Sequence, residues 1–331
     1  MEKVLTIGVP VYNMEKYLDR CLSSITSIKR PDLCEIIVVN DGSKDRSLEI
    51  AKGYESKYPD LLRVIDKENG GWGSCINRTI HEASGKYYKS LDSDDWFDTI
   101  NLDSFIEELK DEDADMILSP YWETDESGNL TVEKVFSPEL YGQTLNLNDY
   151  VQGLGTFKKT IHAIAFKTSI LKNNGIHVWE RFYGDIDYIN SPLKFVETIR
   201  FSPYNIYRYM IGREGQSISV KGYRAHINDY IAVARKMIES FGNPANDTPV
   251  AKYLFDDAVN IATFAYKLMM QPGLCSKEYG ITDLLKDFDK FLKTESPAIY
   301  KEVGRRTKKS GISPVSVWRV TSINIYNIFK V

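Results

Sequence analysis

The sequence predicts an α/β fold: one Rossmann-like, mostly parallel sheet flanked by helices, with a helical C-terminal extension. Across residues 4–92, short apolar runs alternate with stretches in which apolar residues recur at helical spacing. Turn-forming or acidic residues follow each apolar run. From residue 224 onwards the pattern is helical. Strands that alternate with helices build βαβ units with right-handed crossovers, and such units give a parallel sheet.

Four strands and three helices are expected at the start of the chain. Residues 4–9 are almost entirely apolar, as in a buried parallel strand, and Pro10 is expected to end that strand. The next three strands are expected at residues 35–39, 62–65 and 87–92. Amphipathic periodicity predicts the intervening helices at residues 15–28, 47–58 and 74–83.

The pattern is less regular after Asp95. A helix is expected at 99–110 and a strand at 114–119, and residues 121–136 alternate around a Ser-Gly-Asn turn, as in a β-hairpin. Further strands are expected at residues 161–166, 198–201 and 206–210. Further helices are expected at residues 168–173, 183–195, 224–241, 250–270 and 279–292.

The composition excludes several classes of protein. The chain has 331 residues and a net charge of −4, which gives no support for nucleic-acid binding. Its four cysteines lack metal-binding spacing, so we interpret them as buried free thiols, as expected in a reducing cytosol. The N-terminus leads directly into a strand, and no apolar run approaches the ~18 residues that span a bilayer. We therefore expect a cytoplasmic protein.

The C-terminal tail has a different character. Residues 303–331 combine Arg305, Arg306, Lys308 and Lys309 with a segment rich in aromatic and aliphatic side chains. Such a segment can lie on an anionic membrane, which would give the protein a peripheral contact with the inner face of the cell membrane. Docking of the tail on its own domain is the alternative. Pairing of two chains into a homodimer is also left open.

The residues after the fourth expected strand carry the strongest chemical signal. Asp92, Asp94 and Asp95 place three carboxylates at the carboxyl end of a strand, where open α/β sheets bind their ligands. Clustered carboxylates repel one another unless a cation compensates their charge. Carboxylate oxygens suit Mg²⁺ or Mn²⁺, often together with substrate phosphates. The alternative is a solvated acidic turn in which an aspartate caps the following helix.

Polar and glycine residues also follow the first three strands. They are Tyr12-Asn13, Asn40-Asp41 and the segment 69–71. The carboxyl ends of parallel strands meet at one edge of a sheet, so these residues and the acidic turn are expected to line one crevice. The shared position favours a binding site over an isolated surface turn.

Four segments resemble glycosyltransferase family 2, the inverting nucleotide-sugar transferases with the GT-A fold. They are IGVPVYN, EIIVVNDGSKDRSLEIA, KENGG and GKYYKSLDSDDW, in family order and with family-like spacing. The resemblance is good over residues 1–110 and fades towards residue 219. It implies a catalytic domain at 1–222, with a nucleotide-sugar-binding half at 1–110 and an acceptor half at 111–222. The resemblance does not extend beyond residue 222, and residues 223–331 are expected from their pattern to form a helical C-terminal region.

The resemblance implies how the donor nucleotide is held. Pro10, Val11 and Tyr12 resemble the segment that holds the base, with Asn13 directly after them. Asp41 matches the aspartate that accepts a hydrogen bond from the uracil ring, which offers an N–H donor.

Two loops are implied to lie near the rest of the donor. Asn69, Gly70 and Gly71 match a loop that lines the donor site, and this chain has Trp72 next, where many relatives have a small residue. Three residues lie where relatives place a loop that closes over the diphosphate: Arg208, Arg213 and Gln216. For an arginine in that loop, a role as an exposed surface residue is the alternative.

The acidic segment Asp92-Ser93-Asp94 matches the DxD motif of the family. The match implies that Asp94 ligates Mn²⁺ or Mg²⁺ and that Asp92 contacts the ribose or the water shell of the metal. Asp95 would touch the sugar or support these groups. The cation would bridge the two phosphates of the leaving diphosphate and offset its developing charge.

The resemblance also implies a general base. Relatives carry a Glu-Asp pair at the start of a later helix, where this chain has Gly184-Asp185. Asp185 would take the acceptor's proton as the acceptor oxygen attacks the anomeric carbon, with inversion. Asp187 is the other candidate, and a helix N-cap is the structural alternative for Asp185. His81 and His162 lack ligand spacing and are interpreted as structural or surface residues.

The implied reaction is metal-assisted transfer of a sugar from a UDP-sugar to a hydroxyl group. The acceptor would be a glycan, lipid-linked or protein-linked, in bacterial-type assembly of a wall polymer, capsule or glycoprotein. The alternative is a non-catalytic module that binds nucleotide or glycan on the same fold, which the intact acidic motif argues against. A nucleotidyltransferase is disfavoured because PVYNMEK, after the first strand, lacks the glycines of a triphosphate-binding loop.

Overall fold

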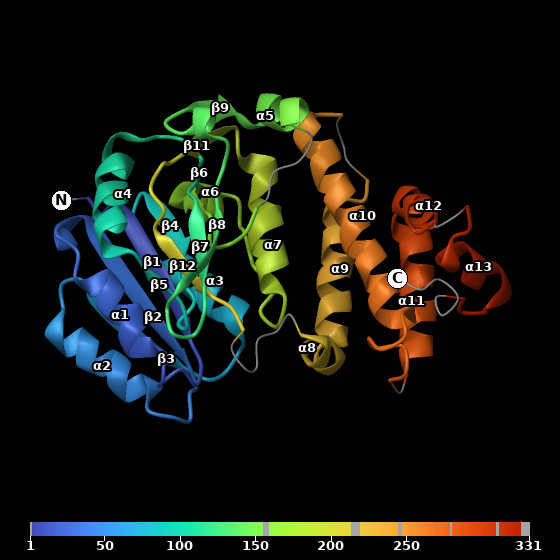
Figure 1. Ribbon diagram of the computed structural model, residues 1–331, viewed down its shortest axis with the longest axis horizontal. Coiled ribbons are helices and arrows are strands. Elements are labelled where there is room, and N and C mark those ends of the chain that lie inside the picture. The colour runs from blue at the N-terminus through green and yellow to red at the C-terminus, as the bar shows by residue number, and fades with distance from the viewer. Residues whose placement is uncertain are drawn as a thin grey trace. The chain divides into compact units, whose positions relative to one another are not determined.

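The computed structural model describes residues 2–154, 159–212, 219–243, 247–278, 280–308 and 311–325. The chain divides into two compact units, residues 1–214 and 215–331 (Figure 1). The first unit contains all the β-strands of the described residues, and the second is built from helices.

The first unit is organised around an eight-stranded sheet with the strand order β3-β2-β1-β4-β10-β6-β11-β9. The predicted parallel core is confirmed, because its four strands run in one direction: β1 (Leu5–Val11), β2 (Cys34–Asp41), β3 (Leu62–Lys67) and β4 (Tyr87–Ser90). The other half is mixed and contains β10 (Ile164–Lys167), β6 (Met116–Leu118), β11 (Thr198–Phe201) and β9 (Thr144–Asn146). The carboxyl ends of β1 to β4 therefore meet at one edge.

Alternation of side chains along β2 decides which helices cover which face of the sheet. Ile36 and Val38 belong to a core shared with α1 (Leu18–Thr26), α2 (Ser47–Lys57) and α4 (Thr99–Asp111). Ile37 and Val39 point to the other face, where they pack against Cys75 of α3 (Trp72–Glu82). Figure 1 shows α1, α2 and α4 grouped together beside the strands. The near-continuous apolar sequence of β2 follows from burial on both faces.

Pro10 does not end β1, contrary to the expectation from the sequence, and the strand continues to Val11. The carbonyl of Gly8 accepts a hydrogen bond from Leu91 (2.9 Å) on the β4 side. Backbone groups two residues apart in a strand point to the same side, so the nitrogen of Pro10 also faces that side. Pairing with β4 ends at Gly8, so the missing N–H of Pro10 interrupts no ladder there.

A second, four-stranded sheet has the order β5-β12-β7-β8. The predicted hairpin is confirmed as β7 (Tyr121–Thr124) and β8 (Leu130–Lys134), which pair antiparallel. The parallel partner of β7 is β12 (Tyr207–Met210), which is antiparallel to the two-residue strand β5 (Trp96–Phe97). The sequence did not predict β5, β9 or α5 (Leu147–Leu154), which are too short to give a clear periodicity.

Two further helices, α6 (Thr168–Asn173) and α7 (Gly184–Asn190), lie on the other face of the main sheet, and α7 carries Asp185 and Asp187. The predicted α6 is confirmed, and Gly175 after it has a φ of 60°. The helix predicted at 183–195 is shorter, because α7 passes into a 3₁₀ helix (Ser191–Phe195). Pro192 has no N–H for an α-helical hydrogen bond at this point.

The second unit contains six helices within the described residues: α8 (Val220–Ala225), α9 (Ile227–Phe241), α10 (Pro249–Met270), α11 (Ile281–Glu295), α12 (Pro297–Arg306) and α13 (Pro314–Thr321). Of these, α12 and α13 were not predicted. Both begin with a Ser-Pro pair in which the serine hydroxyl caps the helix, Ser296 for α12 and Ser313 for α13. No described helix is long and apolar enough to cross a membrane.

Part of the predicted tail is therefore docked as α13. Arg319 donates to Asp289 of α11 (2.7 Å) and to the carbonyl of Tyr300 of α12 (2.8 Å), and its guanidinium lies 3.4 Å from the Tyr300 ring centroid. Val315 and Trp318 are buried beside these contacts. The residues from 326 onwards lie outside the described part of the chain.

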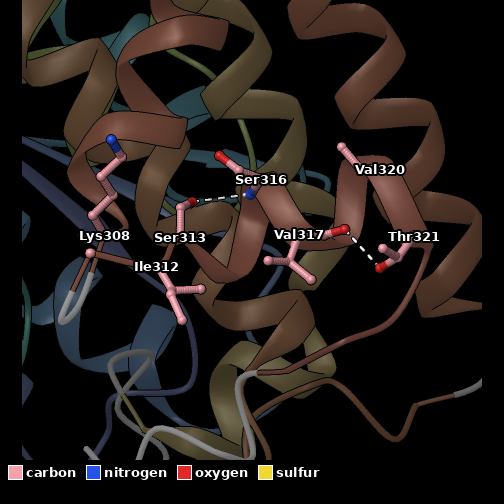
Figure 2. Close-up of a pocket in the computed structure, with 8 residues that line it drawn as sticks. Lys308, Ile312, Ser313, Ser316, Val317, Val320 and Thr321 are labelled. Carbon is pink, nitrogen blue, oxygen red and sulfur yellow. Dashed lines mark hydrogen bonds between the residues drawn. The ribbon is translucent and has the colours of Figure 1, made fainter.

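A hollow of about 400 Å³ lies on the surface of this unit. Figure 2 shows that its lining comes from α13 and the segment before it, including Lys308, Ile312, Ser316, Val317 and Val320. The lining is apolar apart from hydroxyl groups and one lysine. Among the described residues, its lining holds no carboxylate, histidine or thiol, so we do not interpret it as a catalytic site.

Candidate active site

The loops after β1 and β2 are joined to each other at the carboxyl edge of the sheet. Asn13 adopts a left-handed backbone conformation, with a φ of 54°. Its N–H donates to the Ser43 hydroxyl (3.0 Å), and its side-chain oxygen accepts from the Lys44 N–H (2.7 Å). Asn13 was predicted to bind the nucleotide. In the structure, it fixes the position of the loop after β1 relative to the loop after β2.

The predicted base-binding segment offers one exposed side chain. Pro10 and Val11 are buried within β1, so only their backbone groups could reach a ligand. Tyr12 is 48% exposed at the end of the strand. Its ring has the exposure that stacking on a nucleotide base would require.

Asp41 lies at the end of β2 and connects it to the loop after β3. Its carboxylate accepts hydrogen bonds from the Gly70 N–H (2.9 Å) and the Gly71 N–H (2.8 Å), and it pairs with Lys67 (2.5 Å). The side chain of Asn69 donates to the Asp41 carbonyl (3.0 Å). The structure thus brings together Asp41, Asn69 and the two glycines, as the sequence predicted.

The glycines of this loop allow another backbone segment to approach closely. Gly71 has a φ of 91°, and a Cβ atom there would lie 2.4 Å from the carbonyl oxygen of Glu180. A Cβ atom at Gly73 would lie 1.9 Å from the carbonyl oxygen of Trp179. The Gly73 N–H donates to Glu180 (3.0 Å). The loop therefore supports the segment that leads into α7, in addition to any contact with a donor.

Trp72, between these glycines, links the loop to the acidic turn. Its indole N–H donates to the carboxylate of Asp92 (2.8 Å). Its ring lies edge-on to Tyr188 of α7, with centroids 6.2 Å apart. The ring also limits the space at Gly184, where a Cβ atom would lie 3.3 Å from the indole. One side chain thus touches both the acidic turn and the start of α7.

Asp95 is the most enclosed carboxylate of the acidic turn. It accepts hydrogen bonds from the Tyr207 hydroxyl (2.7 Å) and the Met210 N–H (2.8 Å) of β12. Burial, together with the charges of Asp94 and Asp92, raises the pKa of Asp95 well above its usual range. A nearby cation would oppose both effects, which is the electrostatic condition expected at a metal site. The helix cap after this turn is a different residue, Asp98.

His162 lies beside the acidic turn, although its spacing in the sequence predicted only a structural or surface role. One of its ring nitrogens and carboxylate oxygens of Asp92 and Asp95 all lie within 4.8 Å of one another. Its Nδ1 is buried and has no hydrogen-bond partner among the described residues. His81, by contrast, has a largely exposed side chain. His162 lies far from the acidic motif in sequence, so only the fold reveals their proximity.

A buried lysine lies behind His162. The ammonium group of Lys89 on β4 donates to the carbonyl oxygens of His162 (2.8 Å) and Ile164 (3.1 Å). Burial lowers the pKa of Lys89 to about 7. Burial and the Lys89 charge together lower the pKa of His162 to about 3, which keeps its imidazole neutral. A neutral imidazole has a lone pair available for a metal or a hydrogen-bond donor.

The residues of this turn fit a divalent cation. The donor set combines carboxylate oxygens with an imidazole nitrogen, which Mn²⁺ and related metals accept. Within the described part of the chain, Nδ1 of this ring has no hydrogen-bond partner, so its hydrogen bonding there is incomplete. Asp94, predicted as the metal ligand, is buried in the same turn but does not belong to the group formed by Asp92, Asp95 and His162.

Asp185 and Asp187 have different surroundings at the start of α7. The Asp185 side chain is exposed, yet enough protein surrounds it that desolvation raises the pKa of its carboxyl. Asp187 is fully buried and accepts hydrogen bonds from the Trp179 N–H (2.7 Å) and the Ser191 hydroxyl (2.5 Å). No side-chain cap of α7 is present. Asp187 therefore links α7 to the segment before it and to Ser191, whereas the side chain of Asp185 remains accessible to solvent.

Of the three residues that were predicted to lie in a loop over the diphosphate, the structure describes only Arg208. Arg208 is buried on β12 and pairs with Asp98 (2.8 Å), and it also donates to Asn205 (2.9 Å). It is not an exposed arginine, and it does not belong to the group formed by Asp92, Asp95 and His162. Arg213 and Gln216 lie outside the described residues.

Comparison with known proteins identifies the family to which this chain belongs. The model of Glycosyl transferase family 2 matches residues 6–173. Glycosyltransferase GlyA from Streptococcus pneumoniae serotype 4 is 34% identical over 137 residues, 41% of this chain and 19% of the relative. Poly(ribitol-phosphate) beta-glucosyltransferase from Bacillus spizizenii is 30% identical over 222 residues, 65% of this chain and 33% of the relative. These matches thus span a third or less of either relative's length.

The fold itself has a close counterpart among solved structures. Residues 1–349 of TarS from S. aureus, solved in complex with UDP-GlcNAc, superpose with a TM-score of 0.68 at 20% identity. The superposition covers 98% of this chain and 89% of that structure. At this level of identity the likeness concerns the fold, whereas the family model spans more than half of the sequence, from β1 through α6. The chain belongs to glycosyltransferase family 2.

Proposed function

We propose that this protein transfers a sugar from a UDP-sugar to a hydroxyl group of an acceptor, with inversion at the anomeric carbon. One contact carries the proposal: the Trp72 ring touches both the acidic turn, through Asp92, and the start of α7, where Asp185 lies. A donor diphosphate at the turn and an acceptor hydroxyl at Asp185 would therefore be neighbours. Positioning of two reactants supplies much of the catalysis in such a reaction.

Asp185 is the proposed general base. Its carboxylate is exposed, whereas both oxygens of Asp187 already accept hydrogen bonds that hold α7 and the preceding segment. The raised pKa of Asp185 also makes its carboxylate a better proton acceptor than an ordinary surface aspartate. Asp185 would accept the proton of the acceptor hydroxyl as that oxygen attacks the sugar from the face opposite the leaving diphosphate.

The uridine specificity is proposed from the residues at the ends of β1 and β2. Tyr12 offers an exposed ring for stacking, and the carboxylate of Asp41, which is only 2% exposed, would use a remaining lone pair to accept a hydrogen bond from the N–H of uracil. Lys67 and the loop amides already hold the Asp41 carboxylate, which fixes its orientation before the nucleotide arrives. The UDP-GlcNAc bound to TarS supports this choice of nucleotide.

Mn²⁺ or Mg²⁺ is the proposed cofactor, held at the turn that contains Asp92, Asp94 and Asp95. When bound, the cation would offset negative charge on the leaving diphosphate. The protein's own contribution is to hold the carboxylate of Asp92 through Trp72 and that of Asp95 through Tyr207. The proposed acceptor is a bacterial surface glycan, and the poly(ribitol-phosphate) beta-glucosyltransferase relative favours a wall polymer.

Ligand-dependent thermal unfolding tests this function. UDP with Mn²⁺ should raise the unfolding temperature, and a ligand at a hundredfold excess over its Kd adds about 2.7 kcal/mol of stability. UDP without metal, and ADP with Mn²⁺, are the controls and should give smaller shifts. Equal stabilisation by other nucleotides would contradict the role of Asp41. No shift with any nucleotide would favour the non-catalytic alternative.

We also propose a peripheral contact between the second unit and an anionic membrane. Ile312, Val320 and Ile323 are exposed apolar residues around α13, with exposed fractions of 48%, 86% and 61%. Lys308 lines the same hollow as Ile312 and Val320 (Figure 2). Apolar side chains beside a cationic group suit the interface of an anionic bilayer.

A further inference from the structure

We propose that Arg20 is a positioning residue of the transfer reaction, because it holds the acidic turn (residues 92–95) and the tip of the β7–β8 hairpin in one fixed arrangement. The hairpin tip comprises residues 125–129, which lie between the two strands. Arg20 itself lies on α1. The inference rests on the proposed function, since the acidic turn is the proposed place of the donor diphosphate.

The first observation is that Arg20 and the hairpin tip share one aromatic platform. The guanidinium of Arg20 lies over the ring of Trp96, 3.7 Å from its centroid. Trp96 begins β5, directly after the acidic turn. A cation over an indole ring is attracted by the negative face of that ring. Gly128 lies against the same ring, because a Cβ atom there would be 3.6 Å from Trp96 and 3.9 Å from Nη1 of Arg20.

The second observation is that the same guanidinium contacts three segments that are far apart in sequence. It donates to the carbonyl oxygens of Asp94 (3.4 Å) and Glu126 (3.5 Å) and to the sulfur of Met210 (3.3 Å). The two N–H···O contacts are long, so each is weak alone. Because one planar group makes all three contacts, movement of any one segment disturbs the contacts to the other two.

Arg20 orients the acidic turn without occupying its carboxylates. Within the described residues, its hydrogen bond to this turn ends at the backbone of Asp94. It also contacts Met210, whose N–H donates to the Asp95 carboxylate (2.8 Å). An arginine paired with these carboxylates would compete with a cation for the same oxygens. Contact with the backbone fixes the turn and avoids that competition.

Two further side chains hold the hairpin tip beside Arg20. The Glu126 carboxylate accepts hydrogen bonds from the Tyr17 hydroxyl (2.9 Å) and from Lys16, in the turn that leads into α1. Lys16 and Glu126 are exposed, and exposed ion pairs contribute little on their own. The half-buried Arg20 is therefore the main link between the hairpin and the acidic turn.

Lysine should not replace this arginine. The planar guanidinium stacks on an aromatic ring and donates in several fixed directions, whereas lysine carries a compact ammonium group on a flexible chain. The change Arg20→Lys keeps the positive charge and removes the geometry. Wild-type behaviour of Arg20→Lys in the measurements below would therefore overturn the positioning role.

The deciding experiment is amide hydrogen exchange of the nucleotide-free protein, comparing wild type with Arg20→Lys. Two amides report on the two segments: the Asp95 N–H, bonded to the Asp92 carbonyl (3.0 Å), and the Gly128 N–H, bonded to the Asp125 carbonyl (3.0 Å). Both should exchange roughly fivefold faster in the variant, while the amides of β2 stay unchanged. Faster exchange at only one of the two, or at neither, would overturn the coupling.

Nucleotide binding tests whether the coupling serves the donor site. In Arg20→Lys, binding of UDP with Mn²⁺ should weaken by at least about tenfold, as on loss of an outer-shell partner. Binding of UDP without metal, which would use Tyr12 and Asp41, should stay unchanged. Equal weakening of both would indicate a general defect and reject the positioning role. Failure of the wild type to bind UDP would overturn the proposed function and with it this role, whereas the exchange result needs no ligand and would stand.

Three more variants assign the effect to the stacked guanidinium. Trp96→Leu removes the aromatic platform and should reproduce the effects of Arg20→Lys, whereas Trp96→Phe keeps a ring and should retain most of the wild-type behaviour. Arg78→Lys is the matched control, because Arg78 is an exposed arginine of the same unit that bonds to Glu82 on its own helix. Wild-type behaviour of Trp96→Leu, or an equal effect of Arg78→Lys, would reject the assignment.

Discussion

At the scale of single residues, two aspartates two positions apart have different environments, and this difference underlies the roles proposed for them. Asp187 is buried, and both its oxygens accept hydrogen bonds from its own unit. Asp185 is exposed and has a raised pKa. Both residues are carboxylates in the first turn of α7. The sequence alone therefore cannot tell which of them is the base and which has a structural role.

The change Asp185→Asn should lower kcat by roughly a hundredfold to ten-thousandfold, the usual contribution of a general base. UDP binding and the unfolding temperature should stay near wild type, because the side chain is exposed. Steady-state kinetics with nucleotide titration measures both effects. Retained turnover would eliminate Asp185 as the base.

Asp187→Ala should behave differently and destabilise the fold. It leaves the Trp179 N–H and the Ser191 hydroxyl without their acceptor. Each buried unsatisfied group costs about 1–3 kcal/mol. Urea unfolding of the variant measures the loss. A variant of normal stability that lacks turnover would reverse the roles proposed for Asp185 and Asp187.

At the scale of elements, the loop after β3 connects Asp41 at the end of β2 to the segment that leads into α7. Its glycines let the loop approach residues 179–181, and Trp72 between them reaches Asp92. The sequence predicted a donor-lining loop from Asn69 and its glycines. The structure adds that Gly71 and Gly73 are needed for backbone packing as well.

Gly73→Ala should therefore destabilise the protein, because its Cβ would overlap the carbonyl oxygen of Trp179. Overpacking of this kind costs about 1–3 kcal/mol. Gly53→Ala is a matched control within α2, where a Cβ atom meets nothing within 4 Å. It should stabilise by about 0.5–1 kcal/mol through helix propensity. Chemical unfolding compares the two, and equal stabilities would contradict the close approach.

At the scale of the whole molecule, the chain joins a sheet-containing unit to a helical one. The site described above lies entirely in the first unit. The second unit holds no comparable group of metal-binding side chains among its described residues. Its exposed apolar residues around α13 give it the proposed role at a membrane surface.

The intact protein should sediment with vesicles that contain phosphatidylglycerol and remain in solution with vesicles of phosphatidylcholine alone. Val320→Asp and Lys308→Glu should each weaken the interaction, because one removes apolar contact and the other removes positive charge. Ile100→Asp is the control, since Ile100 is an exposed apolar residue of the first unit. Equal sedimentation of all variants, or none with wild type at low salt, would refute the contact.

The sequence by itself determined the parallel core and the edge at which the site lies. Strand-length apolar runs and helical periodicity are local properties, so β1 to β4 and α1 to α4 could be predicted from them. The acidic turn and the residues around Asp41 could be predicted because they follow those strands directly. The predicted strand boundaries were less accurate. A strand can continue through Pro10 only because the pairing with the neighbouring strand β4 ends before this residue.

Only the tertiary structure decided which distant residues complete the site. His162 meets Asp92 and Asp95 because β10 pairs next to β4, and no local pattern encodes that pairing. The distinction between Asp185 and Asp187 depends on burial, because only Asp187 is enclosed and bonded to Trp179 and Ser191 on either side of α7. Local periodicity decides what each segment becomes, whereas packing of segments far apart in sequence decides which side chains share one site.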